Sequence, residues 1–171
     1  LLERGRRVLL LDRDVEANMG ALAKESFGGI WFAGTPLQRR YGIRDGAELG
    51  LRDWHSFAEF GPEDHWPRAW AEAYVHRANE EIFDWLKRIG VEFMPMPLWV
   101  ERGLHTPGNC VPRWHIVWGT GHELAVVLNR HLLAHPRRSL LELHFGHRVE
   151  SLVSANGRVT GCRGMLEESD V

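Results

Sequence analysis

An aspartate directly follows an apolar run near the start of the chain. Residues 8–11 read VLLL, and Asp12 and Arg13 come next. A carboxylate only accepts hydrogen bonds, so at the carboxyl end of a parallel strand it can bind the hydroxyls of a ribose. In dinucleotide-binding folds such an acid lies about 20 residues beyond a GxGxxG fingerprint, which these 171 residues do not contain. The alternative is an aspartate that only solvates the end of a strand.

A stretch rich in glycine and aromatic residues comes after this strand. It contains Ser26, Gly28 and Gly29, and the absence of a side chain at glycine lets backbone N–H groups approach a ligand closely. The neighbouring residues 30–32 are apolar, which is unusual for a solvated linker. We expect this loop to fold over a flat ligand, and an ordinary loop with turn glycines is the alternative.

Histidines gather in a segment that also carries four prolines, residues 94–122. His105, His115 and His122 are candidates for a general acid or base near neutral pH, or for hydrogen-bonded loop residues. His131 and His135 are four residues apart, but the sequence places no third ligand beside them, so we expect no metal site. No GxSxG motif occurs, so a nucleophilic serine is not expected.

The elements that would position these residues alternate between strands and helices. The apolar residues 8–11, after a helix end at 1–5, indicate a strand of a parallel sheet. Asn156-Gly157 favours a tight hairpin turn. The remaining patterns predict an irregular connection at 14–46, helices at 45–60, 67–90 and 119–135, a short strand at 91–93, a proline-rich segment at 94–118, and strands at 140–145, 148–153 and 158–164.

Composition narrows the class of protein. Apolar residues make up 44% of the chain, enough for a core, and 21 basic residues nearly balance 23 acidic ones, which gives no electrostatic case for nucleic acid. No apolar run reaches the roughly 20 residues that span a bilayer. Cys110 and Cys162 form no ligand or disulfide pattern, so reduced thiols in a cytoplasm are expected. Most of the eight tryptophans should pack structural helices, and a few could line a pocket for a flat aromatic ligand.

Both ends of the sequence resemble interruptions of a longer fold. The chain starts without methionine on what reads as the last turn of a helix, and it stops on MLEESDV after a strand. We therefore expect a fragment that lacks the strand and helix of the glycine fingerprint. If it belongs to a dinucleotide-binding protein, such a fragment is expected to retain its dinucleotide weakly or not at all.

Four stretches together resemble a known family. LLERGRRVLLLDRD, SFGGI, GTGHELAVVL and HRVESLVSANGRVTGCRG, in this order, are similar to the FAD-binding domain of the fumarate reductase and 3-ketosteroid dehydrogenase flavoproteins, the FAD-binding-2 family. The resemblance covers most of the chain. It implies a Rossmann-like sheet that binds FAD and a second, cap-like domain that encloses substrate.

The resemblance also implies roles for single residues. Asp12 would bind the adenosine ribose, with Arg13 beside it. The serine and paired glycines of the loop, residues 26, 28 and 29, would lie along the pyrophosphate and the isoalloxazine edge. Val149 would meet the adenine through its backbone. Thr106, in the stretch HTPG, stands where fumarate reductases have an arginine, so the carboxylate clamp of a dicarboxylate substrate is missing.

These observations predict an α/β chain with three parts. Residues 1–44 and 119–171 would belong to a partial Rossmann-like FAD-binding domain with a small antiparallel hairpin, and residues 45–118 to a helical cap or insertion. The predicted function is that of an FAD-dependent dehydrogenase that moves hydride between a small organic substrate and flavin, with ketosteroid-like desaturation as the favoured subclass. The alternatives are an NAD(P)-dependent oxidoreductase and a nucleotide-binding fragment without activity of its own.

Overall fold

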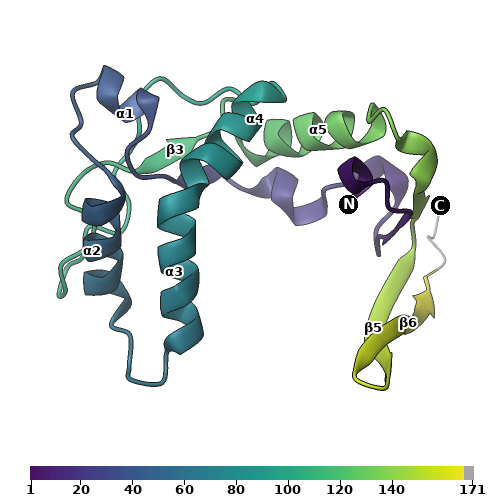
Figure 1. Cartoon of the computed structure of the whole chain (residues 1–171). Helices are drawn as coiled ribbons and strands as arrows, with labels where there is room; N and C mark the ends of the chain where they lie inside the picture. Colours follow the sequence, from purple (N-terminus) through teal and green to yellow (C-terminus); the bar gives the residue numbers. More distant parts are fainter. Residues whose placement is uncertain (168–171) are drawn as a thin grey trace. The chain divides into compact units, whose positions relative to one another are not determined.

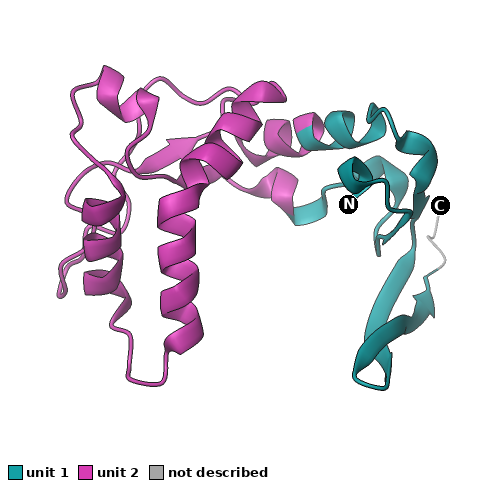
Figure 2. Ribbon diagram, viewed as in Figure 1, with its two compact units in different colours: residues 1–22, 128–171 teal, residues 23–127 magenta. Residues whose placement is uncertain are grey.

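The computed structural model describes residues 1–167, and the chain divides into two compact units (Figures 1 and 2). Unit 1 comprises residues 1–22 and 128–171, and unit 2 comprises residues 23–127. The predicted borders at 44 and 118 concern functional domains and stay a prediction. The interpretation of MLEESDV as an interrupted end falls largely on residues 168–171, which lie outside the described residues.

Unit 1 is built on a parallel pair of strands. A 3-10 turn, Leu2–Arg4, ends at Gly5, whose φ of 66° is the left-handed conformation that glycine adopts without strain. Strand β1 (Val8–Leu11) then pairs in parallel with β4 (Leu141–His144). The predicted parallel sheet is confirmed. Leu9 in β1 is 57% exposed, since β1 pairs with only one strand in the described chain.

A long antiparallel hairpin forms the rest of the sheet structure in unit 1. Strands β5 (His147–Ala155) and β6 (Arg158–Leu166) are joined at Asn156-Gly157, with φ values of 52° and 72°. Both angles are those of a type I′ turn, in which glycine and asparagine are favoured. The predicted hairpin is therefore confirmed. Short 3-10 turns, Glu16–Asn18 and Arg138–Leu140, complete the unit.

Unit 2 surrounds a small antiparallel strand pair with helices. Strand β2 (Gly29–Trp31) pairs with β3 (Trp114–Ile116), next to a 3-10 turn at Ala21–Glu25. The helices are α1 (Pro36–Arg40), α2 (Ala47–Ala58), α3 (His65–Ala78) and α4 (Asp84–Arg88). Phe32, Val91 and Val117 are almost fully buried and form the core with Val75 and Leu86.

The predicted helices are confirmed, and one of them contains a π-helical turn. The helix expected at 67–90 is α3 and α4 joined by a π-helical turn at Asn79–Phe83, where the Asn79 side chain donates to the carbonyl oxygen of Ala33 at 2.7 Å. Helix α5 (Thr120–Leu133) matches the helix expected at 119–135, and the division between the two units falls within it.

The connection at 14–46 is more regular than expected, since it contains β2 and α1. Strand β2 has three residues, and its partner β3 lies far along the chain, so no local periodicity reveals it. The expected strand at 91–93 is a single antiparallel bridge between Phe93 and Val117.

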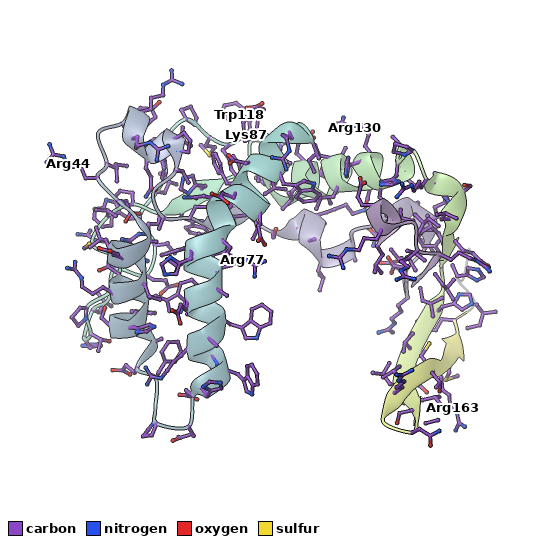
Figure 3. All side chains as sticks on the ribbon, in the orientation of Figure 1. Arg44, Arg77, Lys87, Trp118, Arg130 and Arg163 are labelled. Carbon is purple, nitrogen blue, oxygen red and sulfur yellow. The ribbon has the colours of Figure 1, made fainter. Side chains whose placement is uncertain are left out.

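Half of the tryptophans are exposed, contrary to the expectation that most pack against helices. They are Trp66 (71%), Trp70 (72%), Trp99 (45%) and Trp118 (61%), the last of which is labelled in Figure 3. The apolar spacing within residues 67–90 starts at Trp70. The apolar spacing of four continues to Tyr74 and beyond, but the buried part of α3 begins one residue later, at Ala71.

No helix among residues 1–167 has both the length and the apolar character needed to cross a membrane.

Candidate functional site

Asp12 lies immediately after β1, at the carboxyl end of the parallel pair. Its backbone N–H donates to the carbonyl oxygen of His144, and its own carbonyl oxygen accepts from His147, both at 2.8 Å. Its Oδ1 accepts from the backbone N–H of Asp14 at 2.9 Å, while Oδ2 has no hydrogen-bond partner in the described chain. The carboxylate is therefore oriented by its own backbone and keeps a free acceptor oxygen, as a ribose ligand requires.

Arg13 does not cap this carboxylate. Its Nε donates to Glu167 Oε2 at 2.8 Å, and this exposed ion pair raises the pKa of Arg13. Glu167 also pairs with Arg148 across the base of the hairpin, at 2.9 Å. No guanidinium therefore blocks Asp12, and the acidic end of β1 fits an adenosine-binding role.

Val149 lies at an irregularity of the hairpin. The pairing of β5 with β6 shifts by one residue between Val149 and Ser151, and Val149 is 43% exposed. Opposite it, a Cβ on Gly164 would lie 2.0 Å from the carbonyl oxygen of Arg148, so glycine is needed for this close approach. Bulges of this kind redirect a backbone away from regular pairing and recur beside functional sites.

Ser26, Gly28 and Gly29 lie together in unit 2 against the start of α5. The Ser26 hydroxyl donates to Ala23 and accepts from the Gly28 N–H at 3.2 Å, and the Ser26 carbonyl oxygen accepts from Gly121 at 2.9 Å. A Cβ on Gly28 would lie 2.6 Å from the Thr120 backbone, and one on Gly29 would lie 1.4 Å from Trp114 Nε1. Both glycines are therefore required by packing within the chain, and their contact with a cofactor stays a prediction.

Thr120 begins α5 in an unusual conformation. Its φ is 63°, a value that non-glycine residues rarely adopt, and its N–H donates to the carbonyl oxygen of Val117 at 2.9 Å. Gly121 follows, and a Cβ there would lie 2.0 Å from the carbonyl oxygen of Ala23. The GTG turn thus joins the loop at 23–28 to the helix by backbone contacts.

His115 lies in the core of unit 2 and is 1% exposed. Its Nδ1 donates to the carbonyl oxygen of Arg113 and its Nε2 accepts from the Thr35 hydroxyl, both at 2.8 Å, with Phe32 and Phe83 packed edge-on against the ring. Burial lowers the pKa of His115 to about 4, although the Arg113 carbonyl and Asp45 act in the opposite direction. Both nitrogens are engaged, so the geometry favours a structural role over acid–base chemistry.

The other two candidate histidines are exposed and belong to different elements. His105 lies in the loop before the buried Asn109, and His122 lies in the first turn of α5. No interaction joins His105, His115 and His122 within residues 1–167, so the sequence cluster does not form one site there. Tyr74, on α3, donates to the Trp31 carbonyl oxygen at 2.8 Å, and burial raises the pKa of Tyr74 to about 12.

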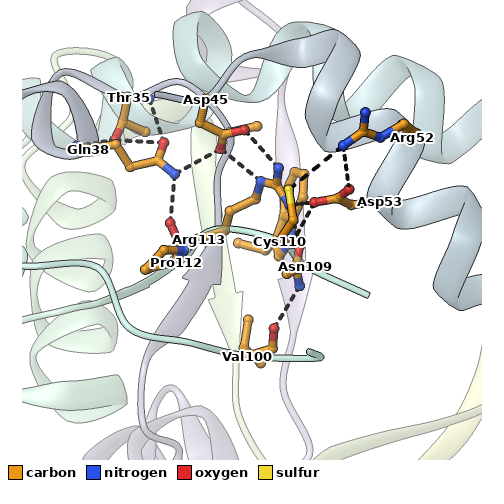
Figure 4. A network of polar contacts seen from close by, with 12 residues as sticks. Thr35, Gln38, Asp45, Arg52, Asp53, Val100, Asn109, Cys110, Pro112 and Arg113 are labelled. Atoms are coloured by element: carbon orange, nitrogen blue, oxygen red, sulfur yellow. Dashed lines mark hydrogen bonds and ion pairs between the residues drawn. The ribbon is translucent and has the colours of Figure 1, made fainter. Parts of the chain in front are cut away.

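A buried polar network in unit 2 was not foreseen from the sequence (Figure 4). Arg113, with no exposed surface, makes four hydrogen bonds: two to Asp45 at 2.8 Å, one to Asp53 at 2.7 Å and one to Asn109 at 2.6 Å. Gln38 adds a bond from its amide to Asp45. The network joins α1, the residues just before α2, the middle of α2 and the loop that leads into β3.

The ion pairs and hydrogen bonds of this network stabilise the ionised form of Asp53. Burial alone would raise the pKa of Asp53, but hydrogen bonds from the Cys110 backbone and from Arg113 outweigh it, and the pKa of Asp53 lies below its ordinary value. Burial raises the pKa of the Cys110 thiol, with Asp53 adding to the effect. Two aspartates against one arginine leave a net negative charge, which Arg52 at 3.7 Å only partly offsets.

Neither cysteine is paired, and no group of three or more His, Cys, Asp or Glu side chains within residues 1–167 has the arrangement of a metal site. In unit 1 the carboxylate of Asp12 has a free acceptor oxygen that could bind a cofactor. Cofactor contacts of Val149, and of Ser26, Gly28 and Gly29 in unit 2, stay predictions.

The chain belongs to the FAD-binding-2 family. Its family model, described as FAD binding domain, matches residues 1–170. The predicted family and cofactor are thus confirmed, and the mixed helix and strand architecture agrees with this class.

The relatives within this family are steroid dehydrogenases by name. A KsdD-like steroid dehydrogenase of Mycolicibacterium smegmatis is 44% identical over 174 residues, which cover 98% of this chain and 31% of the relative. A KsdD-like steroid dehydrogenase of Mycobacterium tuberculosis is 45% identical over 177 residues, which cover 99% of this chain and 30% of the relative. The chain thus spans about a third of the length of these curated relatives.

Solved structures share the fold at low sequence identity. Mycobacterium smegmatis Sdh1, in its apo complex, has a TM-score of 0.68 at 18% identity over 95% of this chain and 27% of its own. The open conformation of a flavocytochrome c3 fumarate reductase has a TM-score of 0.56 at 15% identity over 98% of this chain and 34% of its own.

Proposed function

We propose that this chain is the FAD-binding part of an FAD-dependent dehydrogenase whose substrate is a small ketosteroid-like molecule. The observation that carries the proposal is the free carboxylate of Asp12 at the carboxyl end of β1, in a chain of the FAD-binding-2 family. The names of the relatives at 44% and 45% identity support the substrate class. Thr106, in place of the arginine of fumarate reductases, supports a substrate without two carboxylates.

In this proposal the residues of the chain bind and orient. Asp12 accepts hydrogen bonds from the adenosine ribose, and its fixed backbone keeps the carboxylate in position before the cofactor arrives. Backbone groups at Val149 meet the adenine, and Ser26, Gly28 and Gly29 line the pyrophosphate and flavin edge. When bound, FAD supplies the hydride acceptor, so the protein needs no redox-active side chain.

Proton transfer falls to an exposed group. His115 is neutral and both its ring nitrogens are hydrogen-bonded, so among the three candidate histidines His105 and His122 remain available to hold or release a proton.

An NAD(P)-dependent oxidoreductase and a nucleotide-binding module without activity are the rival functions. The two free cysteines are in keeping with a reducing compartment such as the cytoplasm.

The test is to express the full-length protein that contains this chain, purify it, and record its visible absorption spectrum. A yellow protein that reduces an artificial electron acceptor when a 3-ketosteroid is added supports the proposal. A colourless protein that binds NAD would refute it in favour of the first rival. Flavin absorption without ketosteroid turnover would support an FAD-dependent dehydrogenase but refute the proposed ketosteroid substrate.

A further inference from the structure

Unit 2 contains a small aromatic pocket next to α2. Its volume is about 210 Å³, and Trp31, Trp54 and Phe57 supply its apolar walls. Asp53 and Asn109 are its buried polar residues, with 4% and 8% exposure, and Glu101 adds a further acidic group. A pocket with apolar walls and few polar groups is the usual form of a small-molecule site.

The walls are held in place before any ligand arrives. The rings of Trp31 and Trp54 meet edge to face, with centroids 5.1 Å apart. The Trp31 indole N–H donates to Asn109 Oδ1 at 3.0 Å, and the Arg113 guanidinium lies 5.3 Å from the Trp31 ring centroid. Because the buried network already fixes the Trp31 side chain, this side chain loses little conformational entropy when a ligand binds in the pocket.

The charged group of the pocket with acceptor capacity left is Asp53. Asn109 Oδ1 already accepts from Arg113 and Trp31, and Nδ2 donates one of its two hydrogens to the Val100 carbonyl oxygen at 2.8 Å. Asp53 Oδ2 accepts from Arg113 and from the Cys110 N–H, and Arg52 lies 3.7 Å from Oδ1. The Cys110 thiol, a weak donor, also interacts with this carboxylate, which keeps acceptor capacity for a stronger donor. A carboxylate oxygen in this position recognises a hydrogen-bond donor and repels an anion.

We propose that this pocket binds a one- or two-ring apolar molecule whose hydroxyl or amine donates a hydrogen bond to Asp53. Its volume is below the ~300–1,000 Å³ typical of sites for drug-sized ligands, so it suits a ligand of this size rather than a larger one. A second hollow of about 430 Å³ shares Phe57 and Glu101 with it and includes His105, which leaves room for substituents. Binding of a ligand in this pocket requires no bound flavin.

The experiment uses three one-ring probes on the 171-residue chain. Phenol carries a donor, anisole has the same ring without one, and benzoate carries a negative charge. Tryptophan indole signals in ¹H–¹⁵N spectra report binding, and the Trp54→Phe variant assigns the Trp54 signal. Phenol is expected to shift the Trp31 and Trp54 signals with a Kd on the order of millimolar. Anisole should bind about tenfold more weakly because it cannot donate to a carboxylate, and benzoate should leave the signals in place.

Matched variants separate this pocket from other aromatic surface. Trp54→Ala should abolish the phenol response of Trp31, whereas Trp70→Ala, at an exposed position on α3, should leave it unchanged. Equal binding of phenol and anisole, a response to benzoate, or the absence of any phenol response would overturn the proposal. The comparison of the three probes uses the unmodified chain and the conservative Trp54→Phe variant, so it decides the question even if Trp54→Ala does not fold.

Discussion

Replacing Arg113 by methionine is expected to destabilise unit 2 more than any surface substitution. Methionine keeps much of the volume but removes all four hydrogen bonds and the positive charge, and Asp45 and Asp53 are then buried without a counterion. Removal of one partner from a buried ion pair costs about 3–5 kcal/mol. Because whole proteins are stable by about 5–15 kcal/mol, this is a large share of the free energy of unfolding.

Thermal and urea unfolding followed by tryptophan fluorescence would measure this loss. For a chain of this length each 1 kcal/mol lowers Tm by about 2–4 °C, so Arg113→Met should lower it by roughly 6–20 °C. Arg52→Met is the matched control, since Arg52 is 71% exposed and lies 3.7 Å from Asp53. An exposed pair of this kind contributes at most about 1 kcal/mol.

The reasoning also predicts how a second substitution behaves. Adding Asp45→Asn to Arg113→Met removes one of the unpaired charges, so the double variant should lose less stability than the sum of the two single variants. If Arg113→Met costs no more than Arg52→Met, or if the effects of Arg113→Met and Asp45→Asn simply add, the view of this network as a buried charge cluster is wrong.

Three further outcomes are expected. The pKa of His115 is about 4 in the folded chain and 6.5 in the unfolded chain, so the unfolded state binds more protons between these two values. The free energy of unfolding, measured by urea titration, should therefore fall by about 3 kcal/mol as the pH is lowered from 6.5 to 4. His115→Gln should remove most of this pH dependence. Gly121→Ala should cost about 1–3 kcal/mol in the same assay by overpacking against Ala23, whereas Gly161→Ala, with open space beside it, should be near neutral. In the full-length protein that carries this chain, Asp12→Asn should weaken FAD binding about tenfold by fluorescence titration, and unchanged affinity would refute the ribose role of Asp12.

Local patterns were sufficient for most individual elements. The parallel strand before Asp12 follows from an unbroken apolar run, and the hairpin follows from Asn156-Gly157, whose backbone angles few other residue pairs adopt. The long helices follow from apolar spacing. These features depend on neighbours in sequence, so the sequence by itself determined them, along with the family that their order resembles.

Contacts between distant segments decided the rest. Whether His115 faces solvent or the core depends on its pairing with Thr35 and on the aromatic rings around it, none of which lies nearby in sequence. Arg113 stands between a proline and a tryptophan with no pattern that indicates burial, and it is stabilised only because Asp45 and Asp53 are brought to it. A buried charge requires partners from other elements, so only the tertiary structure decides which charged residues lie inside.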